Sequence, residues 1–133
     1  MKNGYTIFDA HAHVFPNKIA ERATSSISVF YDDMPMQHIG SMEQLLKSGA
    51  NAGIDGYLIC STAINQFLWD SCKDHVNCIA FAAMHPFAPD CQSDMDFILQ
   101  HGFRGIKLHP DFQKFYIDDP AVYPLYEIIQ ETQ

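Results

Sequence analysis

The decisive stretch is Tyr5-Thr6-Ile7-Phe8-Asp9-Ala10-His11-Ala12-His13-Val14-Phe15-Pro16, which begins as an apolar strand and ends in two histidines. Side chains on an extended backbone alternate between the two faces, so Asp9, His11 and His13 are expected on one face. The other face would carry the apolar side chains of Phe8, Ala10, Ala12 and Val14. A proline ends strand pairing, which predicts that the strand stops before Pro16.

The two histidines predict a metal site. Imidazoles two positions apart on a strand can both reach one divalent ion, and polar groups that converge without a ligand are costly to bury. We therefore expect His11 and His13 to ligate one divalent ion, zinc first, with manganese, iron or nickel also suited to these ligands. Asp9 is expected to orient or hydrogen-bond a ligand. The alternative is a pair of strand-end histidines bonded to backbone carbonyls.

Composition narrows the class of protein. The chain has 133 residues, of which 47% are hydrophobic and 18% charged, which predicts a single globular domain spanning residues 1–133. Its formal charge of −8 argues against a nucleic-acid surface, for which a basic stripe is expected. The expected partner is a small-molecule substrate, with no nucleic acid.

The cysteines and the apolar segments indicate the cellular compartment of the protein. The four cysteines, Cys60, Cys72, Cys78 and Cys91, form no Cys-x-x-Cys pair and are interpreted as reduced packing residues. We find no apolar run long enough for a signal peptide or a membrane span. The sequence therefore predicts a cytoplasmic protein without a membrane partner.

Strand and helix patterns alternate along the rest of the chain. Apolar runs at residues 57–60, 78–84 and 103–109 predict three more strands. Helices are expected after a Ser41 cap up to Gly53, over residues 63–75, from Ser93 to Gly102, and after Asp119 and Pro120. The segment 17–40 is interpreted as an irregular loop, either a lid or specificity segment or a surface that packs on a neighbouring subunit.

This alternation predicts an α/β fold with parallel strands joined by right-handed crossovers. Eight such units close a TIM (β/α)8-type barrel over roughly 250 residues, and this chain has four. We therefore expect this chain to supply the N-terminal four β/α units of a barrel. Either the sequence is truncated, or two halves associate, for example as a homo-oligomer. A smaller open α/β sheet is the alternative.

A barrel gathers polar groups at the carboxyl ends of its strands, which here carry His11, His13, His85, Lys107 and His109. Lys107 and His109 alternate with Ile106 and Leu108, so they are expected to face the barrel interior. His109 would contact substrate or metal-bound water, or be a hydrogen-bonded strand-end histidine. Lys107 would bind a substrate carboxylate, or be an interior lysine paired with an acid.

Two motifs, Asp-Ala-His-Ala-His at residues 9–13 and Gly-Ile-Lys-Leu-His-Pro at residues 105–110, resemble the amidohydrolase superfamily of metal-dependent hydrolases. The resemblance is to the amidohydrolase-related branch, which includes aminocarboxymuconate semialdehyde decarboxylase and resorcylate decarboxylases. It implies hydrolysis of an amide, ester or lactone on a divalent metal, and a Lys107 that could be carboxylated to bridge two metals.

The same resemblance leaves alternatives open. It implies a further histidine after strand five and an aspartate after strand eight, and neither region occurs in these 133 residues. A non-oxidative decarboxylase on the same scaffold and a non-catalytic half-barrel that requires association are the alternatives to a hydrolase. A phosphoesterase would need further histidine and acidic clusters that the sequence lacks.

Overall fold

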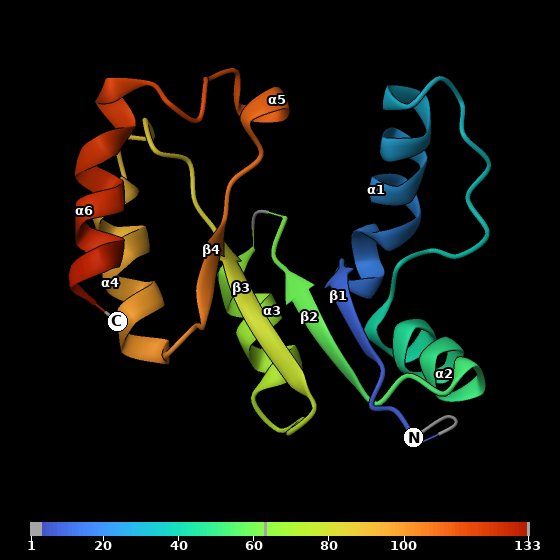
Figure 1. Ribbon diagram of the computed structural model, residues 1–133. Helices are drawn as coiled ribbons and strands as arrows, with labels where there is room; N and C mark the ends of the chain where they lie inside the picture. The colour runs from blue at the N-terminus through green and yellow to red at the C-terminus, as the bar shows by residue number, and fades with distance from the viewer. Residues whose placement is uncertain (1–3, 63, 133) are drawn as a thin grey trace.

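The computed structural model describes residues 4–62 and 64–132, and these form a parallel four-stranded sheet flanked by helices (Figure 1). The strands are β1 (Phe8–Ala12), β2 (Gly56–Cys60), β3 (Cys78–Ala83) and β4 (Gly105–Lys107), in the order β1-β2-β3-β4. Every neighbouring pair is parallel, which confirms the predicted α/β class and brings all four carboxyl ends to the same edge of the sheet.

The helices connect these strands in chain order. They are α1 (Asn17–Phe30), α2 (Met42–Ala52), α3 (Asn65–Cys72), α4 (Cys91–His101), α5 (Pro110–Gln113), the 3-10 turn η1 (Pro120–Val122) and α6 (Tyr123–Glu131). Within the described residues, no helix is both long and apolar enough to cross a membrane.

Local capping signals account for several boundaries. The Ser41 hydroxyl accepts the backbone N–H of Gln44 and begins α2, while Gly53 and Gly102 end α2 and α4 in the left-handed conformation. The Gln44 side chain accepts from the backbone N–H of Ile39. Asp119 accepts from Ala121 ahead of η1, as the sequence predicted.

The prediction of an irregular segment over residues 17–40 is wrong for its first half, which forms the 14-residue helix α1. Its serines bond within the helix, since Ser25 and Ser26 donate their hydroxyls to carbonyls four residues earlier. The chain breakers act only afterwards, where Asp32 and Asp33 adopt positive φ angles. Residues 31–41 are the irregular part.

Other boundaries also differ. The last predicted strand, residues 103–109, pairs only over β4, because the following histidine already caps the short helix α5, which the sequence did not predict. The helix α4 begins at Cys91, ahead of the predicted Ser93. The predicted start of the second helix, residue 63, lies outside the described residues, and α3 ends at Cys72 instead of residue 75.

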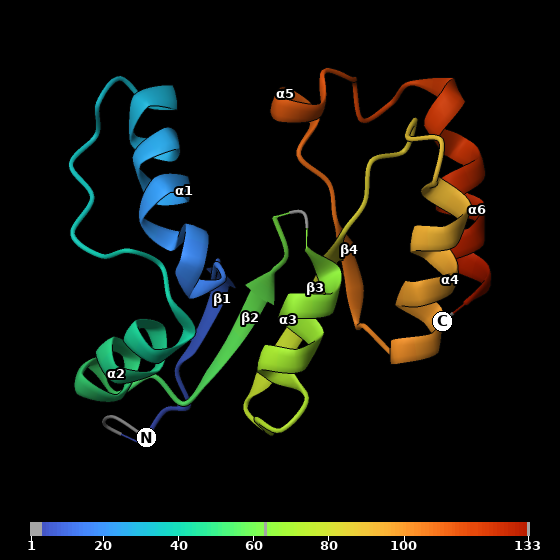
Figure 2. The same ribbon diagram turned by 180° about the vertical axis from the view of Figure 1, so that it is seen from behind.

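Two apolar clusters hold the helices on one face of the sheet. The first joins Ile59 of β2 to Leu68 and Cys72 of α3, and the second joins Ala82 of β3 to Ile98 of α4 and Leu125 of α6. Burial raises the pKa of the Cys72 thiol to about 12, in keeping with its predicted packing role. Figure 2 shows α3 in front of this helix-covered face.

The opposite face, seen in Figure 1, has no helix in front of it. Strand register assigns to it Phe8, Leu58, Ile79 and Phe81, since paired residues of parallel strands project to the same side. Phe8 and Ile79 retain 45% and 37% of their accessible surface. The aromatic rings lie over glycines, where a Cβ at Gly56 or Gly105 would overlap Phe8 or Phe81. We call this surface the inner face.

Candidate metal and substrate site

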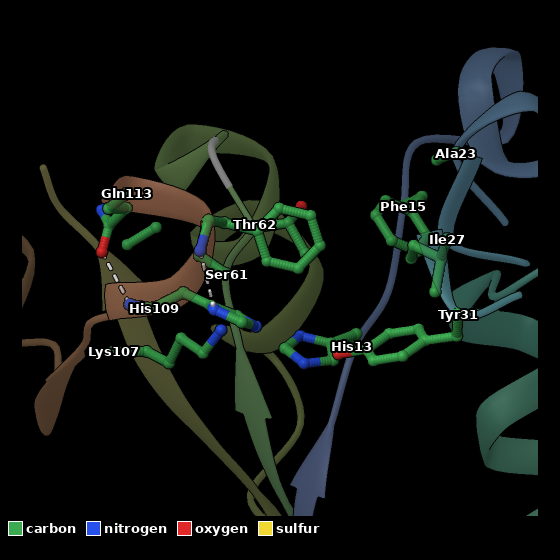
Figure 3. A pocket seen from close by; sticks show the side chains of 12 residues that line it. His13, Phe15, Ala23, Ile27, Tyr31, Ser61, Thr62, Lys107, His109 and Gln113 are labelled. Carbon is green, nitrogen blue, oxygen red and sulfur yellow. Dashed lines mark hydrogen bonds between the residues drawn. The ribbon is translucent and has the colours of Figure 1, made fainter. Parts of the chain in front are cut away.

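A cavity of about 380 Å³ opens at the carboxyl ends of the strands (Figure 3). It is bounded by residues that follow or end all four strands and by residues of α1 and α5. Its lining consists of His13, Phe15, Ala23, Ile27, Tyr31, Ser61, Thr62, Ala83, Lys107, His109, Phe112 and Gln113. This volume falls within the range of small-molecule sites, and the place in the fold is the one where α/β proteins bind ligands.

A β-bulge in β1 decides which polar groups face the cavity. Asp9 pairs with Tyr57 and Ala12 with Ile59, so β1 contains one residue more than β2 between these pairs. Tyr57 and Ile59 point toward the helices, and Asp9 therefore lies on the helix-covered face with Ala12. The prediction that Asp9 shares a face with the two histidines is wrong, because simple alternation does not survive the bulge.

Asp9 nevertheless contacts the site through the backbone. Its carboxylate accepts the backbone N–H of His11 at 3.1 Å, which closes a short turn across the bulge. The aspartate thus holds the backbone that presents the histidine, and it does not contact the imidazole ring.

The two imidazoles face each other. Their Nε2 atoms are 3.0 Å apart, and the Nδ1 atom of His13 lies 2.9 Å from the carbonyl oxygen of Cys60 on β2. A carbonyl only accepts, so Nδ1 of His13 carries the proton and Nε2 carries the lone pair. The backbone-carbonyl bond that was the alternative expectation from the sequence therefore occurs for His13, and metal ligation by the pair stays a prediction.

The surroundings of His13 favour its neutral form. Burial lowers the pKa of His13, the positive charge of Lys107 lowers it further, and the hydrogen bond to the Cys60 carbonyl opposes both effects. A neutral imidazole is the form that binds metal ions.

The two Nε2 atoms lie at hydrogen-bond distance, and the same spacing also fits one shared ion. Two nitrogens each about 2.0–2.1 Å from a zinc ion are about 2.9–3.4 Å apart for bond angles between about 90° and 110°. The observed 3.0 Å lies in this range. Among the described residues, no group of three or more His, Cys, Asp or Glu side chains could hold a metal, so within this part of the chain the pair consists of His11 and His13 alone.

Lys107 and His109 lie across the cavity from the imidazole pair. Lys107 pairs in register with Ala83 and projects from the inner face, as predicted. Burial lowers the pKa of Lys107, and burial together with the Lys107 charge lowers the pKa of His109. Among the described residues no carboxylate bonds to Lys107, so its predicted alternative, pairing with an acid, is not realised.

A relay of hydrogen bonds positions His109. Its backbone N–H donates to the Gln113 side chain at 2.6 Å, and Gln113 donates to the carbonyl of Met84 at 2.6 Å. The Nδ1 atom of His109 accepts from the backbone N–H of Phe112 at the start of α5. The histidine is thereby tied to the end of β3.

His85 does not join the site. Its ring is exposed, and its Nδ1 atom accepts the backbone N–H of Phe87 at 3.2 Å. The strand β3 ends two residues earlier, so the turn that follows carries the ring away from the cavity lining. Of the five strand-end groups, only His13, Lys107 and His109 line the cavity, while the exposed His11 reaches it through its contact with His13.

Sequence reasoning missed the cavity wall that is formed by side chains of α1 and α5. Phe30 stacks on Phe112 with ring centroids 4.1 Å apart, which joins the two helices across the cavity. Ala23, Ile27 and Tyr31 recur at four-residue intervals and line the cavity, and this helical period was the signal that could have revealed them.

No family model and no curated protein matches the chain. Among solved structures, 5-carboxyvanillate decarboxylase from Novosphingobium aromaticivorans superposes with a TM-score of 0.73 at 17% identity, covering 98% of this chain and 49% of that chain. That structure contains bound manganese and 3-methoxy-4-hydroxy-5-nitrobenzoic acid. At this identity the likeness shows the fold, and the chain spans about half the length of the enzyme that it resembles.

Proposed function

We propose that this chain forms the amino-terminal half of the barrel of a metal-dependent enzyme of the amidohydrolase type. The observation that carries the proposal is the His11–His13 pair, whose Nε2 atoms lie 3.0 Å apart at the carboxyl edge of a parallel sheet. The same edge holds the cavity with Lys107 and His109. Active sites of such barrels lie at this edge.

In this proposal His11 and His13 hold one divalent ion, and the Cys60 carbonyl keeps the proton of His13 on Nδ1. When bound, the ion supplies a Lewis acid that polarises a carbonyl group and makes water more acidic. Phe15, Ile27 and Phe112 exclude water from the cavity walls, while His109 offers a second imidazole to the substrate. Zinc and manganese both accept imidazole ligands, and the structurally similar decarboxylase contains manganese.

Hydrolysis of an amide, ester or lactone in a small substrate is the first candidate reaction. Non-oxidative decarboxylation is the second candidate, because the structurally similar enzyme is a decarboxylase, and the fold likeness supports both reactions equally. The two differ in what is released. An assay of the metal-loaded protein that detects carbon dioxide separates decarboxylation from hydrolysis, which yields a new acid and consumes water.

A half-barrel also requires a complementary half. The inner face leaves Phe8 and Ile79 exposed, and β1 and β4 are open edges of the described sheet. In the proposal this face is covered by four further β/α units, supplied by additional residues of the same protein or by a second copy of this chain. The remaining metal ligands would come from that half.

Metal titration tests the imidazole pair. We expect calorimetric titration of the metal-free chain with Zn²⁺ or Mn²⁺ to give one ion per chain, and His11→Ala or His13→Ala to weaken binding at least about tenfold. His85→Ala is the matched control, because its exposed ring bonds to the backbone N–H of Phe87. Circular dichroism confirms that each variant folds, and unchanged affinity in the double alanine variant would refute the site.

A further inference from the structure

The cavity contains basic groups without an acid. His13, Lys107 and His109 line it, and none of its lining residues is an aspartate or a glutamate. Figure 3 shows the Lys107 amine directed toward His109 and His13. A partly buried ammonium group without a carboxylate partner is costly, and an anionic ligand would offset that cost.

Ser61 is a second polar residue of the cavity lining. Ser61 is 3% exposed, and among the described residues its buried hydroxyl forms no hydrogen bond. The backbone N–H of Ser61 donates to the carbonyl of Phe81 at 2.8 Å, so the residue is held in place. Native buried hydroxyls almost always have a partner, and this one adjoins the Cys60 carbonyl that holds His13.

The rest of the lining is apolar. Phe15 follows β1, Ile27 and Tyr31 belong to or follow α1, and Phe112 belongs to α5. An anion that enters this cavity must therefore carry an apolar body of a size that about 380 Å³ can hold. A small inorganic anion would leave these walls without contacts.

We propose that Lys107 and Ser61 form a subsite for the carboxylate of a small substrate with an apolar body. The Lys107 ammonium and the Ser61 hydroxyl both donate hydrogen bonds, and a carboxylate has two oxygens that accept them. The subsite makes Lys107 a specificity-determining residue, which separates acids from amides and esters of the same shape. This substrate class rests on the proposed function, since it assumes that the cavity is the active site.

Binding to the metal-free chain tests the subsite apart from any activity. The probes are benzoate and its neutral isostere benzamide, titrated by NMR in a buffer without carboxylates, with metals removed by a chelating resin. We expect benzoate to bind at least about tenfold more tightly than benzamide, as for a hydrogen bond with a charged partner. Equal affinity for the two probes, or no binding of benzoate, would overturn the subsite.

Single-residue variants test which side chain produces the preference for benzoate over benzamide. Lys107→Met should weaken benzoate binding at least about tenfold and leave benzamide unchanged, while Lys107→Arg should retain most of the preference. Ser61→Ala should lower benzoate affinity several-fold. Lys47→Met is the matched control, because Lys47 is an exposed lysine on α2. Wild-type discrimination in Lys107→Met would overturn the assignment.

Thermal unfolding tests whether Lys107 has a purely structural role. Removal of an unpaired, partly buried charge should leave the melting temperature of Lys107→Met equal to or above that of the wild type. A marked decrease would indicate a structural partner and count against the subsite.

The double variant of His11→Ala and His13→Ala separates the two proposals. Charge-selective benzoate binding that persists in it, with metal binding lost, supports the subsite and the metal site independently. Metal binding by the wild type without charge-selective benzoate binding overturns the subsite alone.

Discussion

At the scale of single residues, His13 shows how one backbone carbonyl sets the chemistry of a side chain. The Cys60 carbonyl orients the ring, fixes its tautomer and leaves Nε2 directed at His11. Neither strand position nor residue type alone specifies this bond, because Cys60 is 47 positions away and reaches the histidine only through strand pairing.

At Gly49 we expect substitution by alanine to destabilise the protein, although alanine normally stabilises a helix. An alanine in a helix is normally more stable than a glycine by about 1 kcal/mol, but a Cβ at Gly49 would overlap the Tyr57 hydroxyl. Tyr57 is 2% exposed and cannot move into solvent. We expect Gly49→Ala to lower the free energy of unfolding by about 1–2 kcal/mol, since overpacking outweighs helix propensity.

Urea denaturation measures that change. Ser48→Ala is the control, because Ser48 is exposed one position earlier in α2 and meets no such contact. It should leave stability unchanged or raise it slightly. A gain of stability in Gly49→Ala would mean that Tyr57 does not pack against this helix.

At the scale of elements, α1 and α5 form a wall that the strand pattern does not predict. α5 has four residues, so its side-chain contact with α1 has an evident role in keeping the cavity bounded. The stacked rings of Phe30 and Phe112 supply that contact, and both rings are about half exposed.

A double-mutant cycle tests this contact. We expect Phe30→Ala and Phe112→Ala to be coupled by about 0.5–1 kcal/mol, the lower part of the range for aromatic pairs because solvent reaches both rings. Hydrogen exchange should accelerate at the end of α1 in either variant. The exposed Val29→Ala is the control, with no coupling to Phe112→Ala expected. Additive effects of the two phenylalanine variants would contradict the wall.

At the scale of the whole molecule, the sheet is covered on one face and open on the other. Helices α3, α4 and α6 bury Ile59, Ala82 and their neighbours, while the inner face keeps large apolar side chains in contact with solvent. Exposed contiguous apolar surface of this kind marks an interaction site.

The inner face should therefore be detectable in solution. We expect the 133-residue chain to bind an apolar fluorescent dye or to self-associate, and the double variant of Phe8→Thr and Ile79→Thr to reduce both effects at least about twofold. Val76→Thr is the control, because Val76 is fully exposed in the turn before β3. Light scattering and dye fluorescence report the result, and a monomer that binds no dye would contradict an uncovered face.

The sequence alone determined the elements whose signals are local. Ser41, Gly53, Gly102 and Asp119 mark helix ends through bonds and backbone angles within a few residues, and apolar runs mark β2 and β3. The same locality explains the failure at α1, where serines that usually favour loops bond back within the helix. The histidine pair was also visible in the sequence, because its members are two positions apart at the carboxyl end of β1.

Only the tertiary structure decided which groups share the cavity. The bulge in β1 places Asp9 on the helix-covered face, the turn after β3 carries His85 away, and strand register places Lys107 among residues without a carboxylate. The positions of Asp9 and Lys107 depend on pairing between segments dozens of positions apart, where one extra residue reverses the face of every side chain that follows. That long-range register is not encoded in any local pattern of residues, and it is what brings His13, Lys107 and His109 to one cavity.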